Sequence, residues 1–118
     1  MTISSNHNTK HMQLNELGEF GLIGKIKELF SAIPLHGCRG IGDDCAVIPT
    51  GAGESLTVTT DMLVEEIHFL RSATDPYRLG RKSLAVNLSD VAAMGATPFA
   101  SFLSIALPRD VSAEWAEQ

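Results

Sequence analysis

The feature of the sequence that most restricts the fold is residues 75–94, which are predicted to form a helix with hydrophobic side chains on almost every side. Asp75 followed by Pro76 predicts the start, because aspartate can accept hydrogen bonds from the first N–H groups and proline needs none there. Gly95 predicts the end. The hydrophobic positions are Leu84, Ala85, Val86, Leu88, Val91, Ala92 and Ala93. Such a helix is expected to be buried all round.

One polar stripe interrupts this apolar surface. Ser83, Asn87 and Asp90 follow one another at spacings of four and three residues, so they share one face of the helix. Burying a carboxylate there costs roughly several kcal/mol unless a cation or several hydrogen-bond donors meet it. We therefore expect Asp90 to bind a cation. The alternative is structural: Asp90 caps a neighbouring loop and Asn87 bonds to the backbone.

Shorter elements are predicted on either side of this helix, and together they indicate an α/β domain. In chain order they are an amphipathic helix over residues 17–33 ended by Pro34, a glycine-rich loop over 36–44, a hairpin of strands 45–49 and 55–63, an apolar strand over 99–107, and a short helix that begins at Asp110 or Ser112. Both faces of strand 99–107 are apolar and need a cover, so we expect a homodimer.

The two ends of the chain give further expectations. Residues 1–15 are polar and predict a flexible tail. The last helix would stop after about one turn, which is too short to be stable alone. We therefore expect the chain to be an incomplete piece of a longer protein.

Composition argues against several classes of protein. The net charge is −5 and the nine Lys and Arg residues are dispersed, which argues against nucleic-acid binding. No stretch approaches the ~20 apolar residues of a membrane helix, and the N-terminus lacks the apolar centre of a secretory signal. We therefore expect no membrane partner and a cytoplasmic location. Cys38 and Cys45 lack the spacing of a zinc or redox site and are predicted to be reduced thiols without a chemical role.

Acidic residues occur at four positions that suit a metal site. Asp43 and Asp44 follow the glycine-rich loop, Asp61 lies near the end of the second predicted strand, and Asp90 lies on the polar stripe. Gly-Asp-Asp alone is a common turn. Two carboxylates ~4 Å apart, however, repel by about 4 kcal/mol at an effective dielectric of about 20, so convergence of several would require a cation or a raised pKa.

The available ligands at these positions all carry oxygen. The hydroxyls of Thr59 and Thr60 precede Asp61, and no spacing of Cys and His suits zinc. Oxygen ligands in this number favour Mg²⁺, which keeps several waters and shares itself with substrate phosphates. His68 lies in a short apolar run and is, on composition alone, more often a core or loop histidine than a ligand.

Three segments together resemble the thiamine-monophosphate kinase family, which is related to aminoimidazole ribonucleotide synthetase: GIGDDCAVI (residues 40–48), TVTTDMLVEEIHF (57–69) and KSLAVNLSDVAAMGA (82–96). The resemblance implies an α/β sandwich like the N-terminal domain of that synthetase, with a mixed sheet, helices on one face, and sheets that pair across a dimer. Residues 16–118 would be an incomplete N-terminal domain that binds ATP and Mg²⁺, and the C-terminal domain would be absent.

The resemblance also implies a reaction and its binding residues. The reaction is ATP-dependent phosphorylation of thiamine monophosphate to thiamine diphosphate, which needs no covalent intermediate, so no catalytic side chain is assigned. His68 would bind thiamine monophosphate. The implied metal ligands are Asp44, Thr59, Thr60, Asp61 and Asp90, with Asp43 as a weaker candidate. The chain by itself is expected to be inactive. Two alternatives stay open: a dimerisation or ligand-binding module without chemistry, and a relative that acts on another phosphorylated substrate.

Overall fold

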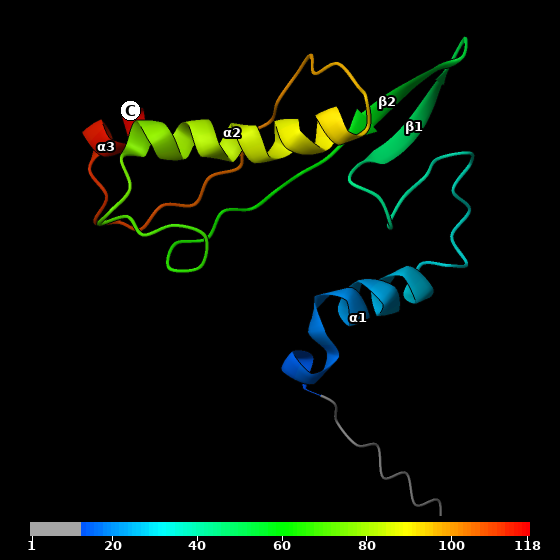
Figure 1. The fold of residues 1–118 in the computed structure, drawn as a ribbon, viewed down its shortest axis with the longest axis horizontal. Coiled ribbons are helices and arrows are strands. Elements are labelled where there is room, and N and C mark those ends of the chain that lie inside the picture. The colour runs from blue at the N-terminus through cyan, green and yellow to red at the C-terminus, as the bar shows by residue number, and fades with distance from the viewer. Residues whose placement is uncertain (1–12) are drawn as a thin grey trace, which may run out of the picture. The chain divides into compact units, whose positions relative to one another are not determined.

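The computed structural model describes residues 13–118, which fall into two units, one ending at His36 and the other spanning Gly37–Gln118. The predicted tail over residues 1–15 lies almost wholly outside the described residues. The elements, shown in Figure 1, are α1 (Leu14–Leu29), β1 (Ala46–Gly51), β2 (Glu54–Val58), α2 (Pro76–Ala93) and α3 (Ala113–Glu117). None of these helices combines the length and the apolar character that crossing a membrane requires.

The first unit contains α1, whose bounds differ from the predicted 17–33. The backbone N–H of Gln13 donates to Glu16 Oε2 at 3.0 Å, which fixes an earlier start. Gly18 interrupts the helix with a φ of 69°, a conformation that glycine adopts at little cost. Phe30 leaves the helical region well before Pro34, and single turns follow it. Within this first unit, as far as the structure describes it, Phe20 is 86% exposed.

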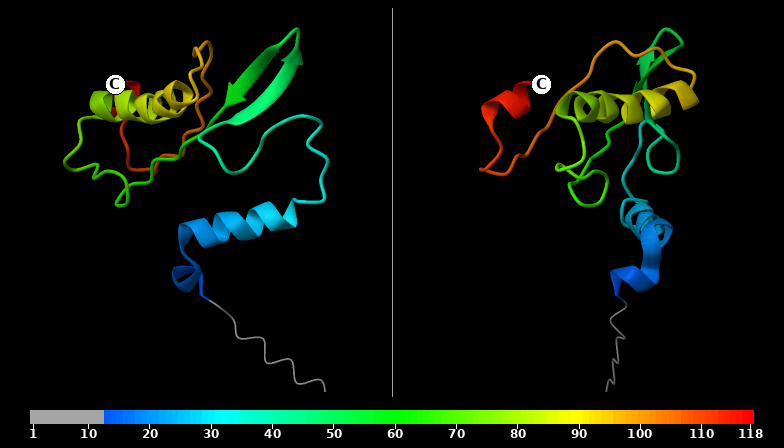
Figure 2. Two further views of the ribbon diagram at one scale, coloured as in Figure 1. Left: turned by 45° about the vertical axis from the view of Figure 1, so that its right-hand side comes forward. Right: turned by 60° about the vertical axis from the view of Figure 1, so that its left-hand side comes forward.

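The second unit begins with a glycine-rich loop and the predicted hairpin. β1 and β2 are antiparallel, and Ala46 pairs with Val58 at the open end of the ladder. Arg39, in the preceding loop, bridges to Val47 of β1. The second strand is shorter than the predicted 55–63, because β1 offers no partner beyond Ala46. The chain after Val58 therefore leaves the sheet, as Figure 2 shows.

Helix α2 has the predicted bounds. Asp75 Oδ1 accepts a hydrogen bond from the backbone N–H of Arg78 at 3.0 Å, and Gly95 follows the C-terminal end with a φ of 65°. The expectation that α2 is buried all round is wrong within the described chain. Leu84 is 47% exposed and Leu88 is 38% exposed, because a two-stranded hairpin and one loop cover little of the helix surface.

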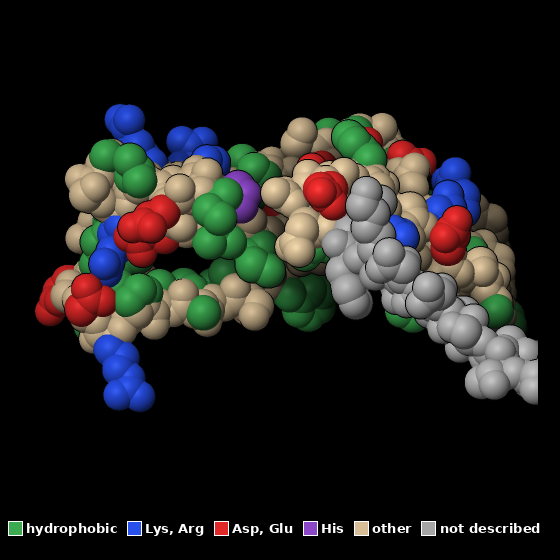
Figure 3. All heavy atoms as spheres, turned by 90° about the horizontal axis from the view of Figure 1, so that it is seen from below, with side chains coloured by type: hydrophobic (Ala, Val, Ile, Leu, Met, Phe, Trp, Pro, Cys, Tyr) green, Lys and Arg blue, Asp and Glu red, His purple; other side chains and the backbone are tan. Residues whose placement is uncertain are grey.

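The predicted strand over residues 99–107 is not formed, so that prediction is wrong for this chain. Phe99, Phe102 and Leu103 are 80%, 100% and 79% exposed. A strand needs a neighbour for its backbone N–H and C=O groups. The described residues contain a two-stranded antiparallel sheet rather than the mixed sheet that was expected. In the space-filling view, apolar side chains lie open between charged ones (Figure 3).

The segment after residue 107 leads back to the N-terminal end of α2, where α3 lies (Figures 1 and 2). Ser112 caps α3 by accepting a hydrogen bond from the backbone N–H of Trp115 at 3.2 Å. Of the two predicted starts, Ser112 rather than Asp110 is therefore confirmed.

Replacing Asp75 by Ala tests the start of α2. The substitution removes the acceptor for the Arg78 N–H, and we expect a loss of about 1 kcal/mol in the free energy of unfolding. Asp75→Asn keeps a capping oxygen and should stay within a few tenths of the parent. Urea denaturation followed by circular dichroism measures both variants, and equal stability of Asp75→Ala and Asp75→Asn would show that the cap contributes nothing.

Candidate functional site

The chain after β2 runs along the polar stripe of α2. Thr59 Oγ1 donates a hydrogen bond to Asp90 Oδ2 at 2.8 Å, and both side chains are half-buried. Two residues further on, the backbone N–H of Asp61 donates to Asn87 Oδ1 at 3.0 Å. Asn87 and Asp90 therefore face the segment that carries three of the predicted metal ligands.

The third member of the stripe, Ser83, turns back onto its own helix. Its hydroxyl donates to the carbonyl of Gly80 at 2.7 Å, and Asn87 Nδ2 donates to the carbonyl of Ser83 at 2.9 Å. Asn87 thus bonds to backbone on both sides, as the structural alternative expects. No second hydrogen bond to the Asp90 carboxylate is found among residues 13–118, so Oδ1 is left open to another ligand.

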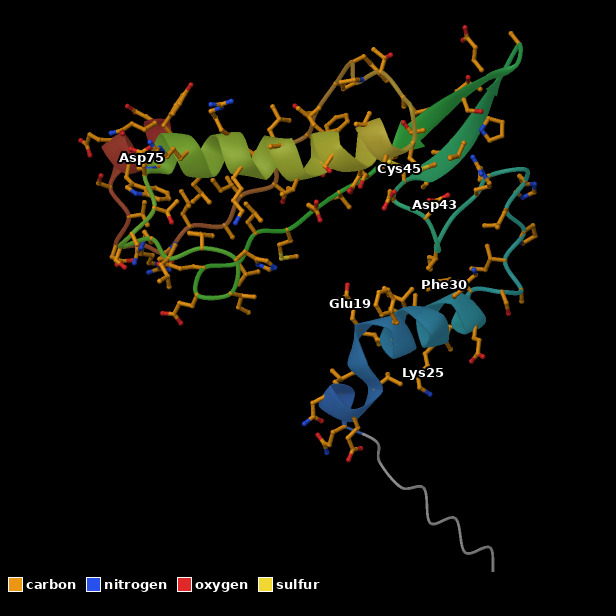
Figure 4. All side chains as sticks on the ribbon, in the orientation of Figure 1. Glu19, Lys25, Phe30, Asp43, Cys45 and Asp75 are labelled. Atoms are coloured by element: carbon orange, nitrogen blue, oxygen red, sulfur yellow. The ribbon has the colours of Figure 1, made fainter. Side chains whose placement is uncertain are left out.

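Cys45 lies directly before β1, where its thiol is within range of the charges of three predicted ligands. Cys45 is 2% exposed and is the most deeply buried residue among residues 13–118. Burial raises the pKa of this thiol, and the negative charges of Asp90, Asp44 and Asp43 raise the pKa further, while a hydrogen bond with Thr59 acts in the opposite direction. Figure 4 shows Cys45 at the start of the hairpin and Asp43 on the loop before it. No role was predicted for Cys45, because burial that depends on the tertiary fold leaves no local sequence pattern.

The Gly-Asp-Asp turn is exposed on the loop before β1. Asp43 Oδ1 accepts a hydrogen bond from the backbone N–H of Asp44 at 3.1 Å, so this oxygen serves the turn itself. No hydrogen bond to the Asp44 carboxylate is found in the described part of the chain. Both aspartates stay candidate ligands, with Asp43 as the weaker prediction.

The remaining candidates, Thr60 and Asp61, are exposed beside this site. Within residues 13–118, no three His, Cys, Asp or Glu side chains are close enough together to hold one ion. The donor set is nevertheless all oxygen and suits Mg²⁺, which takes few protein ligands and fills its shell with water. The ligand assignments therefore stay predictions.

His68 lies on the next part of the same chain segment. Its Nδ1 accepts a hydrogen bond from the backbone N–H of Val64 at 2.9 Å, and its carbonyl accepts one from Lys82 Nζ at 2.7 Å. Lys82 precedes Asp90 by eight residues, or about 12 Å along the helix axis. His68 and Asp90 are therefore tied to the same rigid element.

An ion-pair cluster that the sequence did not predict lies beyond His68. Arg71 Nε contacts Glu65 Oε1 at 3.0 Å, and Arg71 Nη2 contacts Asp110 Oδ2 at 3.3 Å. The hydrogen bond from Arg71 lowers the pKa of Asp110. An open cavity of about 600 Å³ lies between this cluster and Trp115 of α3. The cluster fastens the segment before α3 to the loop that carries His68.

The reactivity of Cys45 tests whether the carboxylates of Asp90, Asp44 and Asp43 act on this thiol. Burial and negative charge keep the thiol protonated, so iodoacetamide should modify Cys45 more slowly than Cys38 in the native chain at neutral pH. Because the folded-state pKa is raised, the stabilisation from the protonated thiol is complete below the pKa of a free thiol and is lost as pH rises through the folded-state pKa.

Asp90→Asn removes one of the charges that raise this pKa and should speed alkylation of Cys45 at a given pH. Mass spectrometry of the two cysteine peptides, with urea-unfolded chain as the reference, gives the rates. Equal rates for both thiols in the native chain would contradict the buried placement of Cys45.

Known proteins share this arrangement of segments. Over 105 residues, 89% of this chain, the sequence is 43% identical to the thiamine-monophosphate kinase of Synechococcus elongatus, of which it covers 30%. It is 41% identical over 107 residues to the thiamine-monophosphate kinase of Aquifex aeolicus (91% of this chain, 32% of that protein), and 45% identical over 100 residues to that of Escherichia coli K12 (85% and 30%). No solved structure was found to match.

The chain therefore spans 30–32% of the length of these curated relatives. Residues 42–118 match the family described as AIR synthase related protein, N-terminal domain. That range holds the Gly-Asp-Asp turn, the hairpin, the polar stripe of α2 and α3. The chain belongs to the family of AIR synthase related proteins, and its residues 42–118 match the N-terminal domain of that family.

Proposed function

We propose that this chain is part of an ATP-dependent kinase that phosphorylates thiamine monophosphate to thiamine diphosphate. The observation that carries the proposal is identity of 41–45%, over 85–91% of the chain, to three proteins named thiamine-monophosphate kinase. The aligned lengths are large enough to include the Gly-Asp-Asp turn, the threonine-aspartate strand end and the polar stripe of α2.

The proposed metal is Mg²⁺, held by the oxygen ligands at the junction of the hairpin and α2. The Thr59–Asp90 hydrogen bond and the tie of Asp61 to Asn87 support this placement, because both hold candidate ligands on one face of the helix. The full set of proposed ligands is Asp44, Thr59, Thr60, Asp61 and Asp90, with Asp43 as a weaker one. Neutralising the charge of the phosphates is the chemistry that bound Mg²⁺ supplies.

His68 is proposed to bind the phosphate of thiamine monophosphate. Its link to α2 through Lys82 supports this role, since it fastens the main chain of His68 to the helix that also carries Asp90. Phosphoryl transfer asks the protein mainly to align two anionic groups and to offset their charge. No side chain is therefore proposed as a nucleophile, and ATP is the proposed co-substrate.

A homodimer in the cytoplasm is proposed as the working form. The apolar residues 99–107 support it, because Phe102 is fully exposed and Phe99 is 80% exposed in the single chain. Pairing of this segment with a sheet of a second copy would satisfy its backbone groups and cover both faces.

Asp90→Asn, made in the complete kinase that contains this chain, tests the metal assignment. Asparagine keeps the size of the side chain and an acceptor for Thr59, but it removes the charge that would hold the ion. We expect kcat/KM to fall by at least about 100-fold, a loss typical of removing an electrostatic group from a phosphoryl-transfer site. Formation of thiamine diphosphate from ATP and thiamine monophosphate, with Mg²⁺, is the measurement.

Asp75→Asn is the matched control, because it makes the same change at the other end of α2 and keeps the cap. Its kcat/KM should stay within about twofold of the parent. Parental activity of Asp90→Asn would remove Asp90 from the site. Failure of the parent to form thiamine diphosphate would overturn the proposed reaction, and turnover of another phosphate monoester would then favour a related enzyme.

The 118-residue chain alone is expected to show no turnover of thiamine monophosphate. It spans only 30–32% of the length of the kinases that it resembles, so it has no counterpart to the greater part of their sequence. The same assay, run on purified chain at a concentration far above that of the complete enzyme, measures this. Thiamine diphosphate formed in proportion to the added chain would contradict the expectation.

A further inference from the structure

The loop after the strand end holds His68 by a reciprocal pair of hydrogen bonds. The backbone N–H of Val64 donates to His68 Nδ1 at 2.9 Å, and the backbone N–H of His68 donates to the carbonyl of Val64 at 2.8 Å. Both distances lie in the normal range for such bonds. The two residues thus close a ring that fixes the main chain and the imidazole together.

This ring determines which nitrogen of His68 carries the proton. A neutral imidazole has one N–H donor and one acceptor nitrogen. Because Nδ1 accepts from Val64, the neutral ring is protonated at Nε2. The edge of the ring that remains is therefore a hydrogen-bond donor, which suits an oxygen of an anionic ligand.

The loop is also closed from its other side. The backbone N–H of Glu66 donates to the carbonyl of Phe69 at 2.8 Å, and Glu66 has a φ of 67°, which is unusual for a residue other than glycine. Glu65, in turn, is held by Arg71. A conformation of this kind persists only where its surroundings impose it, so the loop depends on its anchors.

Lys82 is the anchor between this loop and α2. Its ammonium donates to the carbonyl of His68 at 2.7 Å, and this charge-assisted bond fastens the very residue that closes the ring. Three contacts follow one another along α2, at Asp90 with Thr59, at Asn87 with Asp61, and at Lys82 with His68.

We propose that Lys82 is a positioning residue for substrate recognition. Lys82 holds His68 at a fixed place along α2 relative to Asp90. At that place the Nε2–H of His68 donates to the phosphate monoester of the substrate. The inference rests on the proposed kinase function. Lys82 acts through His68 and does not itself contact the substrate, so it should affect binding of the monoester and leave the use of ATP unchanged.

Lys82→Met in the complete kinase tests the positioning role by kinetics. We expect KM for thiamine monophosphate to rise roughly tenfold, while kcat and KM for ATP change by less than about twofold. Lys82→Arg keeps a cationic donor and should restore KM to within about threefold of the parent. Arg81→Met removes the positive charge next to Lys82. The Arg81 side chain makes no hydrogen bond among residues 13–118, so this variant should leave all three constants unchanged.

A second readout does not depend on turnover. With the same proteins labelled uniformly with ¹⁵N, the ring nitrogen shifts report the tautomer of His68, and amide exchange reports the Val64 N–H. The parent should show the Nε2–H tautomer and a protected Val64 amide, and Lys82→Met should speed exchange of that amide at least about tenfold.

An Nδ1–H tautomer in the parent would overturn the proposal, as would an unchanged KM and unchanged Val64 exchange in Lys82→Met. A large fall in kcat together with a rise in KM for ATP in Lys82→Met would also overturn it, because these changes indicate general damage to the enzyme. If the parent forms no thiamine diphosphate, the proposed function fails, and the tautomer and exchange data still decide whether Lys82 holds His68.

Discussion

The hydrogen bond from Thr59 to Asp90 is the contact on which the rest of the site depends. It is the first of three bonds by which the chain after β2 runs antiparallel along α2, followed by Asp61 on Asn87 and His68 on Lys82. Because α2 rises by about 1.5 Å per residue, these spacings along the helix are rigid. Helix α2 therefore holds the segment that carries Thr59 and Asp61 and the loop that carries His68 at fixed positions along its axis.

These polar contacts position the chain but supply little of its stability. A hydrogen bond contributes about 0.5–1.5 kcal/mol net, whereas covering one large apolar side chain contributes about 1.5–3 kcal/mol. Phe99, Phe102 and Leu103 remain open, and Leu84 of α2 is 47% exposed. The larger part of the stabilising free energy thus depends on apolar surface that the single described chain leaves uncovered, which is why a second sheet is the expected complement of this fold.

The sequence predicted the elements whose ends are set by interactions between residues close in the chain. The bounds of α2 follow from Asp75 and Gly95, and the hairpin follows from its glycine turn, because each device acts within a few residues. The strand predicted over 99–107 is not formed, because an apolar pattern shows that a segment avoids water but not which strand would pair with its backbone. The prediction for α1 missed its bounds because the Gln13–Glu16 contact starts the helix earlier and Phe30 ends it without a breaker residue. The stripe on α2 was predictable from spacing, whereas burial of Cys45 and the Lys82 contact to a carbonyl leave no sequence pattern.

The structural and the metal interpretations of the stripe are compatible at the level of single atoms. Thr59 donates its one hydroxyl proton to Asp90 Oδ2, so its hydrogen bond with Cys45 uses one lone pair of the hydroxyl oxygen and the second lone pair is the one that a cation could use. Asn87 is bonded to the backbone N–H of Asp61, and this contact orients Asp61 without using its carboxylate. Burial raises the pKa of the Cys45 thiol, and the negative charges of Asp90, Asp44 and Asp43 raise the pKa further. Bonds within the protein therefore orient the candidate oxygen ligands without using their carboxylate charge, and that negative charge is of the sign that Mg²⁺ would offset.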